Sequence, residues 1–300
     1  LDVEQFELDL GPAFLNGNAE AFHGGTAEGS LGFSPLVRAE HPGRRMLRFA
    51  YLDADLDLAV DSLDFINMFA GNLSSFNITG AGRVQGHLSV SDGFVRAGTQ
   101  LSATAENLSV DMYDVNVLGK GVVNIHTPET EDIPLGLDVQ YDQLTATRDG
   151  ESTPFLIGET LHLEYRGPNF ITPDPELGLA DLWDDEEARQ RRANNSLSLF
   201  VDRATVPDMS ALNYHLPPET KLQFAGGTTE LNAELFFGEE SLGGTIQLDS
   251  VATQVQIDEQ RLKADLDIDM NLAGGNPRTF TADFTGSTLR LFNVYVEGEK

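Results

Sequence analysis

The sequence contains no cysteine, few basic residues and no long apolar run. Without cysteine no disulfide stabilises the chain, which therefore fits either a reducing cytosol or a bacterial periplasm. The 19 Lys and Arg residues stand against 48 Asp and Glu, a net charge of −29. Nucleic acid and anionic headgroups both attract clustered basic residues, so this balance argues against nucleic acid as a partner. No apolar run approaches the roughly 18 residues of a membrane-spanning helix, and no signal peptide is recognisable at Leu1.

Signals for catalysis are also missing. The six histidines are far apart in the sequence, and no pair has the spacing of metal ligands. Asp265, Asp267 and Asp269 share one strand face, but no glycine-bearing calcium loop surrounds them, which favours a solvated face over a Ca²⁺ site. A nucleophile elbow and a phosphate-binding glycine loop are absent. The sequence therefore predicts no enzyme, no catalytic residue, no metal and no cofactor.

What is present is alternation. Leu52, Ala54, Leu56, Leu58 and Val60 alternate with Asp53, Asp55 and Asp57, which predicts a strand with one apolar and one acidic face. Leu266, Ile268 and Met270 alternate in the same way with the three aspartates named above. About twenty such segments, separated by Gly, Pro, Asn and Asp, predict an all-β chain of hairpins. A further turn is expected at Gly119–Gly121.

One segment, 179–193, is expected to be a helix. Acidic residues lie in its N-terminal half and arginines in its last turns, the order that the helix dipole favours. We interpret it as an insertion that caps or decorates the sheet.

Two stretches resemble each other. Asn67 and Asn213 are 146 residues apart, and Gly80 and Gly227 are 147 apart. In both stretches a short apolar piece precedes the asparagine, a strand runs into the glycine, and apolar residues follow the glycine at four and eight positions. This predicts two degenerate repeats, at 61–125 and 206–272, within a single elongated unit over 1–300.

The second stretch resembles the core of the AsmA-like superfamily, which includes AsmA, TamB, YhdP and YdbH and is grouped with the bridge-like lipid-transfer proteins. The resemblance is carried by 206–210, by the Leu216-Pro217-Pro218 stop, by 222–227, and by the alternation of Leu231, Ala233 and Leu235. The earlier stretch, 73–90 with 101–110, is similar to the same pattern. Together they cover about a third of the chain.

This resemblance implies a long, curved antiparallel sheet that forms an open, taco-like apolar groove. It also implies a place in the periplasm of a Gram-negative cell, as part of an inner-membrane-anchored protein whose anchor is absent from this chain. The expected function is to shield phospholipid acyl chains during transport between inner and outer membrane, or in outer-membrane biogenesis. The membrane or other envelope proteins would be further partners.

The apolar strand faces also fit the interior of an ordinary β-sandwich, so a β-solenoid or sandwich module that acts as a scaffold or adhesin-type interaction module is an alternative. A carbohydrate-active enzyme with paired carboxylates is a second alternative, although aromatic residues make up only 8% of the chain. If the groove hypothesis holds, its candidate lining residues are Phe76, Ile78, Val84, Leu88, Leu222, Phe224, Leu231, Leu235, Leu266, Ile268, Met270, Phe280 and Phe284.

Overall fold

The structure is a computed structural model, which describes residues 2–10, 13–15, 19–34, 49–70, 76–91, 94–128, 135–167, 195–215, 221–238, 241–258, 260–276 and 281–296. The chain divides into two compact units. Unit 1 comprises Leu1–Tyr113, Leu118–Gln140 and Glu164–Ser196, and unit 2 comprises Asp114–Val117, Tyr141–Leu163 and Leu197–Lys300. The expected helix at 179–193 lies outside the described residues.

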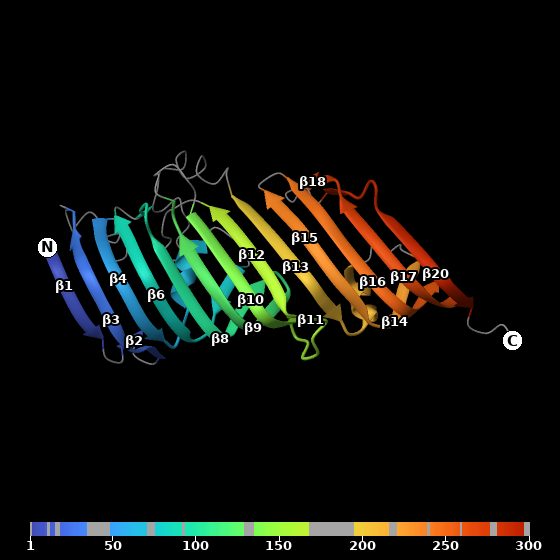
Figure 1. Cartoon of the computed structure of the whole chain (residues 1–300), viewed down its shortest axis with the longest axis horizontal. Helices are drawn as coiled ribbons and strands as arrows, with labels where there is room; N and C mark the ends of the chain where they lie inside the picture. Colours follow the sequence, from blue (N-terminus) through green and yellow to red (C-terminus); the bar gives the residue numbers. More distant parts are fainter. Residues whose placement is uncertain are drawn as a thin grey trace. The chain divides into compact units, whose positions relative to one another are not determined.

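Unit 1 is built from antiparallel strands and one short helical segment (Figure 1). Its elements are β1 (Asp2–Leu10), β2 (Ala13–Leu15), β3 (Ala19–Phe33), β4 (Ala50–Val60), η2 (Asp64–Ile66), α1 (Asn67–Ala70), β5 (Phe76–Thr79), β6 (Gly82–Ser91), β7 (Phe94–Val95) and β8 (Gln100–Met112). Three strands are divided between the units: β9 (Val115–His126), β10 (Leu135–Arg148) and β12 (Thr160–Gly167); a fourth, β13 (Ser196–Val206), has only its first residue, Ser196, in unit 1.

Unit 2 has the same character. Its further elements are β11 (Leu156–Gly158), β13 (Ser196–Val206), η4 (Met209–His215), β14 (Leu222–Gly226), β15 (Thr229–Gly238), β16 (Leu242–Ile257), β17 (Gln260–Leu272), β18 (Gly274–Asn276), β19 (Thr281–Asp283) and β20 (Thr288–Val296). The all-β antiparallel fold with one short helix is thus confirmed. Among the described residues no helix is long and apolar enough to cross a membrane.

Alternation along β4 shows why these segments become strands. Leu58 pairs with Val84 of β6 and Gly25 of β3, and all three are on the apolar face. Asp57 points to the opposite face, where its carboxylate bonds the Arg83 guanidinium at 2.6 and 2.7 Å. A period of two therefore places every aspartate of β4 on the polar face, as the sequence predicts.

The turn expected at Gly119–Gly121 is wrong. Both glycines lie inside β9, and the chain reverses at 113–114, where Tyr113 takes a positive φ of 57°. A turn that does form at a glycine lies at Asp149 and Gly150, between β10 and the next strand, with Gly150 at φ 78°. Glycine is therefore a weaker turn signal in this chain where strand pairing on both sides satisfies the backbone.

Each unit contains one bent strand that follows a helical turn. In unit 1, β5 and β6 together run antiparallel to β8, with the bend at Gly80. In unit 2, β14 and β15 together run antiparallel to β16, with the bend at Gly226 and Gly227. The two bends have the same order of elements: helical turn, short strand, glycine, long strand.

An asparagine joins the helical turn to the short strand in both units. Asn213 accepts a hydrogen bond from the Phe224 N–H at 2.8 Å and donates one to the Phe224 carbonyl at 2.8 Å. Asn67 does the same to Ile78, at 2.7 Å from its N–H and 2.8 Å to its carbonyl. We call each pair of bonds an asparagine clamp. It satisfies two backbone groups that would otherwise lie at a strand edge without a partner.

A backbone bond closes the same loop on the far side of the glycine. The Leu63 N–H donates to the Gly80 carbonyl and the Met209 N–H to the Gly227 carbonyl, both at 2.8 Å. Gly80 has φ 138°, and a Cβ there would lie 2.8 Å from the Asn107 carbonyl oxygen. The bend thus needs glycine both for its φ and for the close approach of β8.

In unit 2 a second contact fixes η4. The side chain of Arg148, next to the β10–β11 hairpin tip, lies between the rings of Phe155 and Tyr214, 5.2 and 4.5 Å from their centroids. Its guanidinium also donates to the Ala211 carbonyl of η4. These cation–π and hydrogen-bond contacts tie the hairpin to the helical turn.

We predict that Asn213→Ala lowers the free energy of unfolding by about 2–3 kcal/mol, because two part-buried backbone groups of Phe224 lose their partner. Urea denaturation followed by circular dichroism measures this. The matched control is Asn232→Ala, which removes one exposed hydrogen bond to the Arg203 N–H. Its cost should stay under about 1 kcal/mol. An equal decrease in the free energy of unfolding in the two variants would show that the asparagine clamp stabilises the fold no more than an exposed hydrogen bond does.

Candidate functional site

The apolar face of each unit's sheet, which we call its inner face, is the candidate functional site. In unit 2 it is formed by cross-strand rows. One row contains Leu231 of β15, Leu248 of β16, Ile268 of β17 and Leu289 of β20. The next row contains Ala233, Ile246 and Met270. All these residues share one face because the strand period is two, and the rows are close enough to pack.

Burial changes along the inner face of unit 2. At the end next to η4, Phe224, Val255 and Leu266 form a buried cluster with Met209. Away from that end, Leu231, Ile246 and Met270 pack against the cluster but remain half-buried. The face is thus a closed core near η4 and an accessible apolar surface further along.

Buried hydroxyls mark the closed end. Ser250 and Thr253 bond each other at 2.6 Å, and the Thr253 hydroxyl donates to the Met209 sulfur at 3.5 Å. The Thr229 hydroxyl donates to the Asp249 carbonyl at 2.9 Å. These bonds satisfy the buried hydroxyls of β15 and β16, so the end of the inner face that η4 covers contains only paired hydroxyls among these three.

The one other sheet among the described residues of unit 2 is the two-stranded sheet of β18 and β19, and β18 contacts β16. The principal contacts of β14, β15, β16 and β17 there are with neighbouring strands, with η4 and with β18. In a sandwich, a facing sheet would bury the Ile246 and Met270 rows. The half-burial of those rows is therefore the main structural difference from a sandwich core.

The inner face of unit 1 is more fully buried. Val84 of β6, Leu101 of β8 and Leu137 of β10 are almost inaccessible to solvent. Leu52, Leu56 and Leu88 remain half-buried. Leu63, at the start of η2, and Ile66, within it, have no exposed surface. Unit 1 thus has the same closed end as unit 2, with less accessible apolar surface beyond it.

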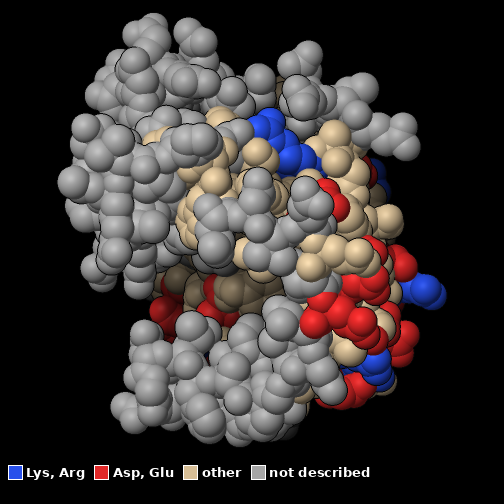
Figure 2. All heavy atoms as spheres, turned by 90° about the vertical axis from the view of Figure 1, so that its left-hand side faces the viewer, with Lys and Arg blue, Asp and Glu red and all other residues tan. Residues whose placement is uncertain are grey.

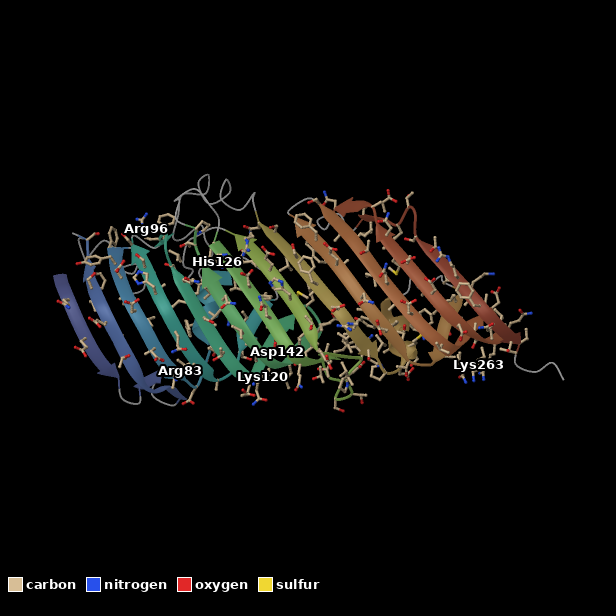
Figure 3. All side chains as sticks on the ribbon, in the orientation of Figure 1. Arg83, Arg96, Lys120, His126, Asp142 and Lys263 are labelled. Atoms are coloured by element: carbon tan, nitrogen blue, oxygen red, sulfur yellow. The ribbon has the colours of Figure 1, made fainter. Side chains whose placement is uncertain are left out.

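The outer face of unit 1 is acidic. Asp53, Asp55 and Asp57 project from β4, and Figure 2 shows acidic side chains gathered on one side of its view. The basic residues on this face are paired: Lys120 lies 2.8 Å from Glu106, and Arg83 binds Asp57 (Figure 3). The hydrogen bond from Arg83 lowers the pKa of Asp57 below its ordinary value. The Asp57 carboxylate therefore stays charged at neutral pH.

The structure separates the predicted lining residues into three groups. Ile78, Val84, Phe224, Leu266 and Ile268 are buried. A second group is half-buried, with Leu222 at the closed end: Phe76, Leu88, Leu222, Leu231, Leu235 and Met270. Phe284 is exposed, and Phe280 lies outside the described residues. The buried residues lie beneath the accessible apolar surface. The half-buried residues away from the closed end contribute to that surface.

Sequence reasoning missed several residues of the inner face. Ile246 and Leu248 of β16 occupy the centres of the two rows, and Met209 closes one end. A register shift between Ser250 and Thr253 interrupts β16, and it places Val251 in solvent. This bulge breaks the alternation on which strand recognition depends. The alternation of Ile246 with Gln247 and of Leu248 with Asp249 was the available signal.

Asp265 holds two bulges together on the outer side of unit 2. Its carboxylate accepts a bond from the Asn293 side chain at 2.6 Å and one from the Ala252 N–H at 2.8 Å. Ala252 and Asn293 both have a positive φ, 57° and 48°. The bonds from Asn293 and then from Ala252 lower the pKa of Asp265. Asp267 pairs with Arg290 at 3.1 Å, so two of the three aspartates of β17 have structural partners.

A depression of about 700 Å³ lies at this bulge. It is lined by carboxylates, threonines and two exposed apolar side chains: Thr205, Thr228, Thr229, Glu230, Asp249, Ser250, Val251, Asp265, Leu266, Asp267 and Phe292. Asp265 and Asp267 are occupied by the contacts just described. The chemistry of the depression therefore differs from that of the inner face.

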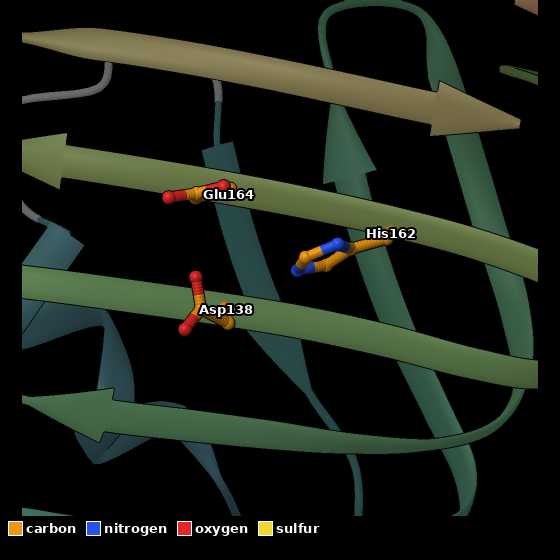
Figure 4. A group of neighbouring side chains, drawn as sticks. All are labelled: Asp138, His162 and Glu164. Carbon is orange, nitrogen blue, oxygen red and sulfur yellow. The ribbon is translucent and has the colours of Figure 1, made fainter. Parts of the chain in front are cut away.

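Three side chains with metal-ligand chemistry, Asp138, His162 and Glu164, are neighbours in Figure 4. The Arg166 guanidinium binds Glu164 and lies 3.1 Å from Asp138. His126 lies 3.4 Å from the second oxygen of Asp138. A guanidinium between two carboxylates supplies the charge that a cation would bring, so the arrangement is that of an ion-pair network.

A comparison with protein-family models, a search of curated proteins and a search of solved structures each gave no match. The inner face is therefore interpreted from its own geometry.

We predict that Asn293→Ala raises the pKa of Asp265 toward the ordinary carboxyl value, because the strongest bond to the charged form is lost. NMR titration of the side-chain carboxyl measures it. A lowered pKa in the folded state means that the two bonds to the Asp265 carboxylate stabilise the protein at neutral pH. This stabilisation is lost as the pH falls through the folded pKa. Asp283, whose pKa Thr285 lowers, is the internal control and should not move.

Proposed function

We propose that the chain shields phospholipid acyl chains on the inner face of its sheet. The observation that carries this proposal is the accessible apolar surface of unit 2, where Leu231, Leu235, Ile246 and Met270 remain half-buried in adjoining rows. A soluble protein rarely exposes adjoining apolar rows unless a partner or ligand covers them.

The energetic gain is large for a hydrocarbon chain. Each methylene removed from water contributes about 0.8 kcal/mol, so an acyl chain of about sixteen carbons that crosses bare solvent costs on the order of 13 kcal/mol. A row of Leu, Ile and Met side chains replaces water contacts with apolar ones at each step. The rows of β15–β17 repeat this environment along the strands, which suits a linear and flexible ligand.

The chemistry of the two faces supports an acyl chain over a polar ligand. The described rows of the inner face at its accessible end contain apolar side chains and glycine, as in the row of Leu235, Gly244 and Leu272. The outer face has the carboxylates and keeps the sheet in water. Binding would therefore depend on apolar area, with little selection among acyl chains of similar length.

The resemblance to the AsmA-like superfamily extends the proposal to the cell. It suggests a periplasmic protein of a Gram-negative bacterium, with a part in phospholipid transport between inner and outer membrane or in outer-membrane biogenesis. The absence of cysteine agrees with a fold that needs no disulfide. In this proposal the protein performs no catalysis.

We predict that the protein purified from bacteria carries phospholipid. Native mass spectrometry and lipid extraction would detect the bound species, and a fluorescent acyl-chain probe would gain intensity on the protein. Met270→Asp, on the accessible rows, should reduce bound lipid several-fold. Asp269→Asn, one residue away on the outer face, is the control and should leave it unchanged. A protein without lipid that also gives no probe signal would favour a scaffold function.

A paired substitution separates the accessible part from the core. Phe224 is 4% exposed, so Phe224→Asp buries a carboxylate without a partner and should cost several kcal/mol, enough to unfold unit 2. Leu235 is half-buried, and the carboxylate of Leu235→Asp can reach water. We expect a melting temperature close to wild type for Leu235→Asp together with reduced lipid binding. Similar destabilisation by both substitutions would mean that the whole inner face is a closed core.

A further inference from the structure

Strand β20 is the most exposed apolar strand of unit 2. Leu289, Phe292, Val294, Tyr295 and Val296 are all between 45% and 69% exposed. Within the described part of unit 2, β20 is registered to β17 alone, and Figure 1 shows it as the outermost strand of that unit. A strand in this position presents a row of N–H and C=O groups that can pair with another chain.

The cross-strand rows show what is missing at this edge. In the row of Leu231, Leu248 and Ile268, exposure is 8% at Ile268 and 46% at Leu289 of β20. Leu266 is buried, but its partner Leu291 is only half-buried. The rise occurs over one strand because β20 has an apolar neighbour on one side only. The row would be completed by one more strand with apolar side chains on the inner face.

The charges near β20 indicate which kind of strand could pair with it. β17 contains three aspartates, and β20 contains no Asp or Glu. Its one charged residue, Arg290, is paired with Asp267. In a chain with a net charge of −29, two copies repel each other wherever carboxylates meet. The β20 edge is a place where two copies can approach without opposing carboxylates.

A bulge limits the length of this edge. The β17–β20 register shifts between Lys263 and Asp265, opposite Asn293, which Asp265 holds. The regular part of the edge is therefore 288–292. It carries Leu289 and Leu291 toward the inner face and Arg290 and Phe292 toward the outer face.

We propose that this edge is a self-association site, in which residues 290–292 of β20 pair antiparallel with the same residues of a second copy about a two-fold axis at Leu291. This register places Leu291 against Leu291 of the second copy on the inner face. It places Arg290 opposite Phe292 of the second copy, where a guanidinium can lie on the ring. Both copies then present their inner faces on the same side of the joined sheet. The dimer does not require lipid, so it is independent of the proposed function.

Sedimentation equilibrium over micromolar concentrations tests the dimer. Phe292 is 49% exposed and Phe236 of β15, an internal strand, is 44% exposed, so Phe236→Lys is a matched control for Phe292→Lys. Phe292→Lys sets a lysine opposite Arg290 twice in the symmetric pair. It should weaken the dimer about tenfold, while Phe236→Lys should not. Because the copies repel, the wild-type dimer should tighten as salt is raised.

Single cysteines in this cysteine-free chain test the register. In Leu291→Cys the two thiols lie on the axis, with Cβ atoms about 5 Å apart, and mild oxidation should give a covalent dimer. In Leu289→Cys the two thiols are offset by four residues, about 14 Å, and should not link. A chain that sediments as a monomer throughout, a dimer unaffected by Phe292→Lys, or equal linking of the two cysteine variants would overturn the proposal. Circular dichroism confirms that each variant is folded.

Discussion

The asparagine clamp is the constraint on which the two bends depend. A strand that bends at glycine loses its neighbour on one side, because the preceding strand does not follow it past the bend. The backbone groups of Ile78 and Phe224 would then lack partners, at a cost of about 1–3 kcal/mol for each buried group. Asn67 and Asn213 supply both partners from a single side chain. The helical turn that holds each asparagine is thereby fixed over the sheet, and its apolar residues close one end of the inner face.

This arrangement explains why the same sheet can be both core and surface. Next to η4, Met209 covers Thr253, and the cluster around Phe224 is closed to water. Further along β15 and β16 the same alternation continues, but the apolar residues there are only half-buried. Stability can therefore come from the covered end. The rows at Leu231 and Met270 pack against that cluster and keep apolar surface exposed, which the proposed ligand would cover.

Charge on the outer face has two consequences. Carboxylates on neighbouring strands repel one another, and Arg83 and Arg290 reduce this repulsion only locally. The net charge of −29 favours solubility of a sheet with an exposed apolar face, and it opposes unspecific stacking of copies. The Asp265 carboxylate of β17 accepts hydrogen bonds from Ala252 of β16 and Asn293 of β20, and it thereby fixes the bulges of these two strands. The acid-free strand β20 is the exception in this pattern, and it lies at an edge.

The sequence by itself determined the strands and the assignment of residues to faces. The alternation in β4 and β17 was sufficient for this, because a period of two allows only one division of the side chains. It also pointed to Asn67 and Asn213 and to the glycines that follow them, and in the structure both asparagines make the same two backbone bonds. Only the tertiary structure decided which apolar residues are buried. Phe224 and Leu235 have the same pattern in the sequence, yet one lies under a helical turn and the other does not. The bulge at Val251, the turn at Tyr113 and the partners of Asp265 were likewise set by neighbouring strands, because cover and pairing come from residues distant in the chain.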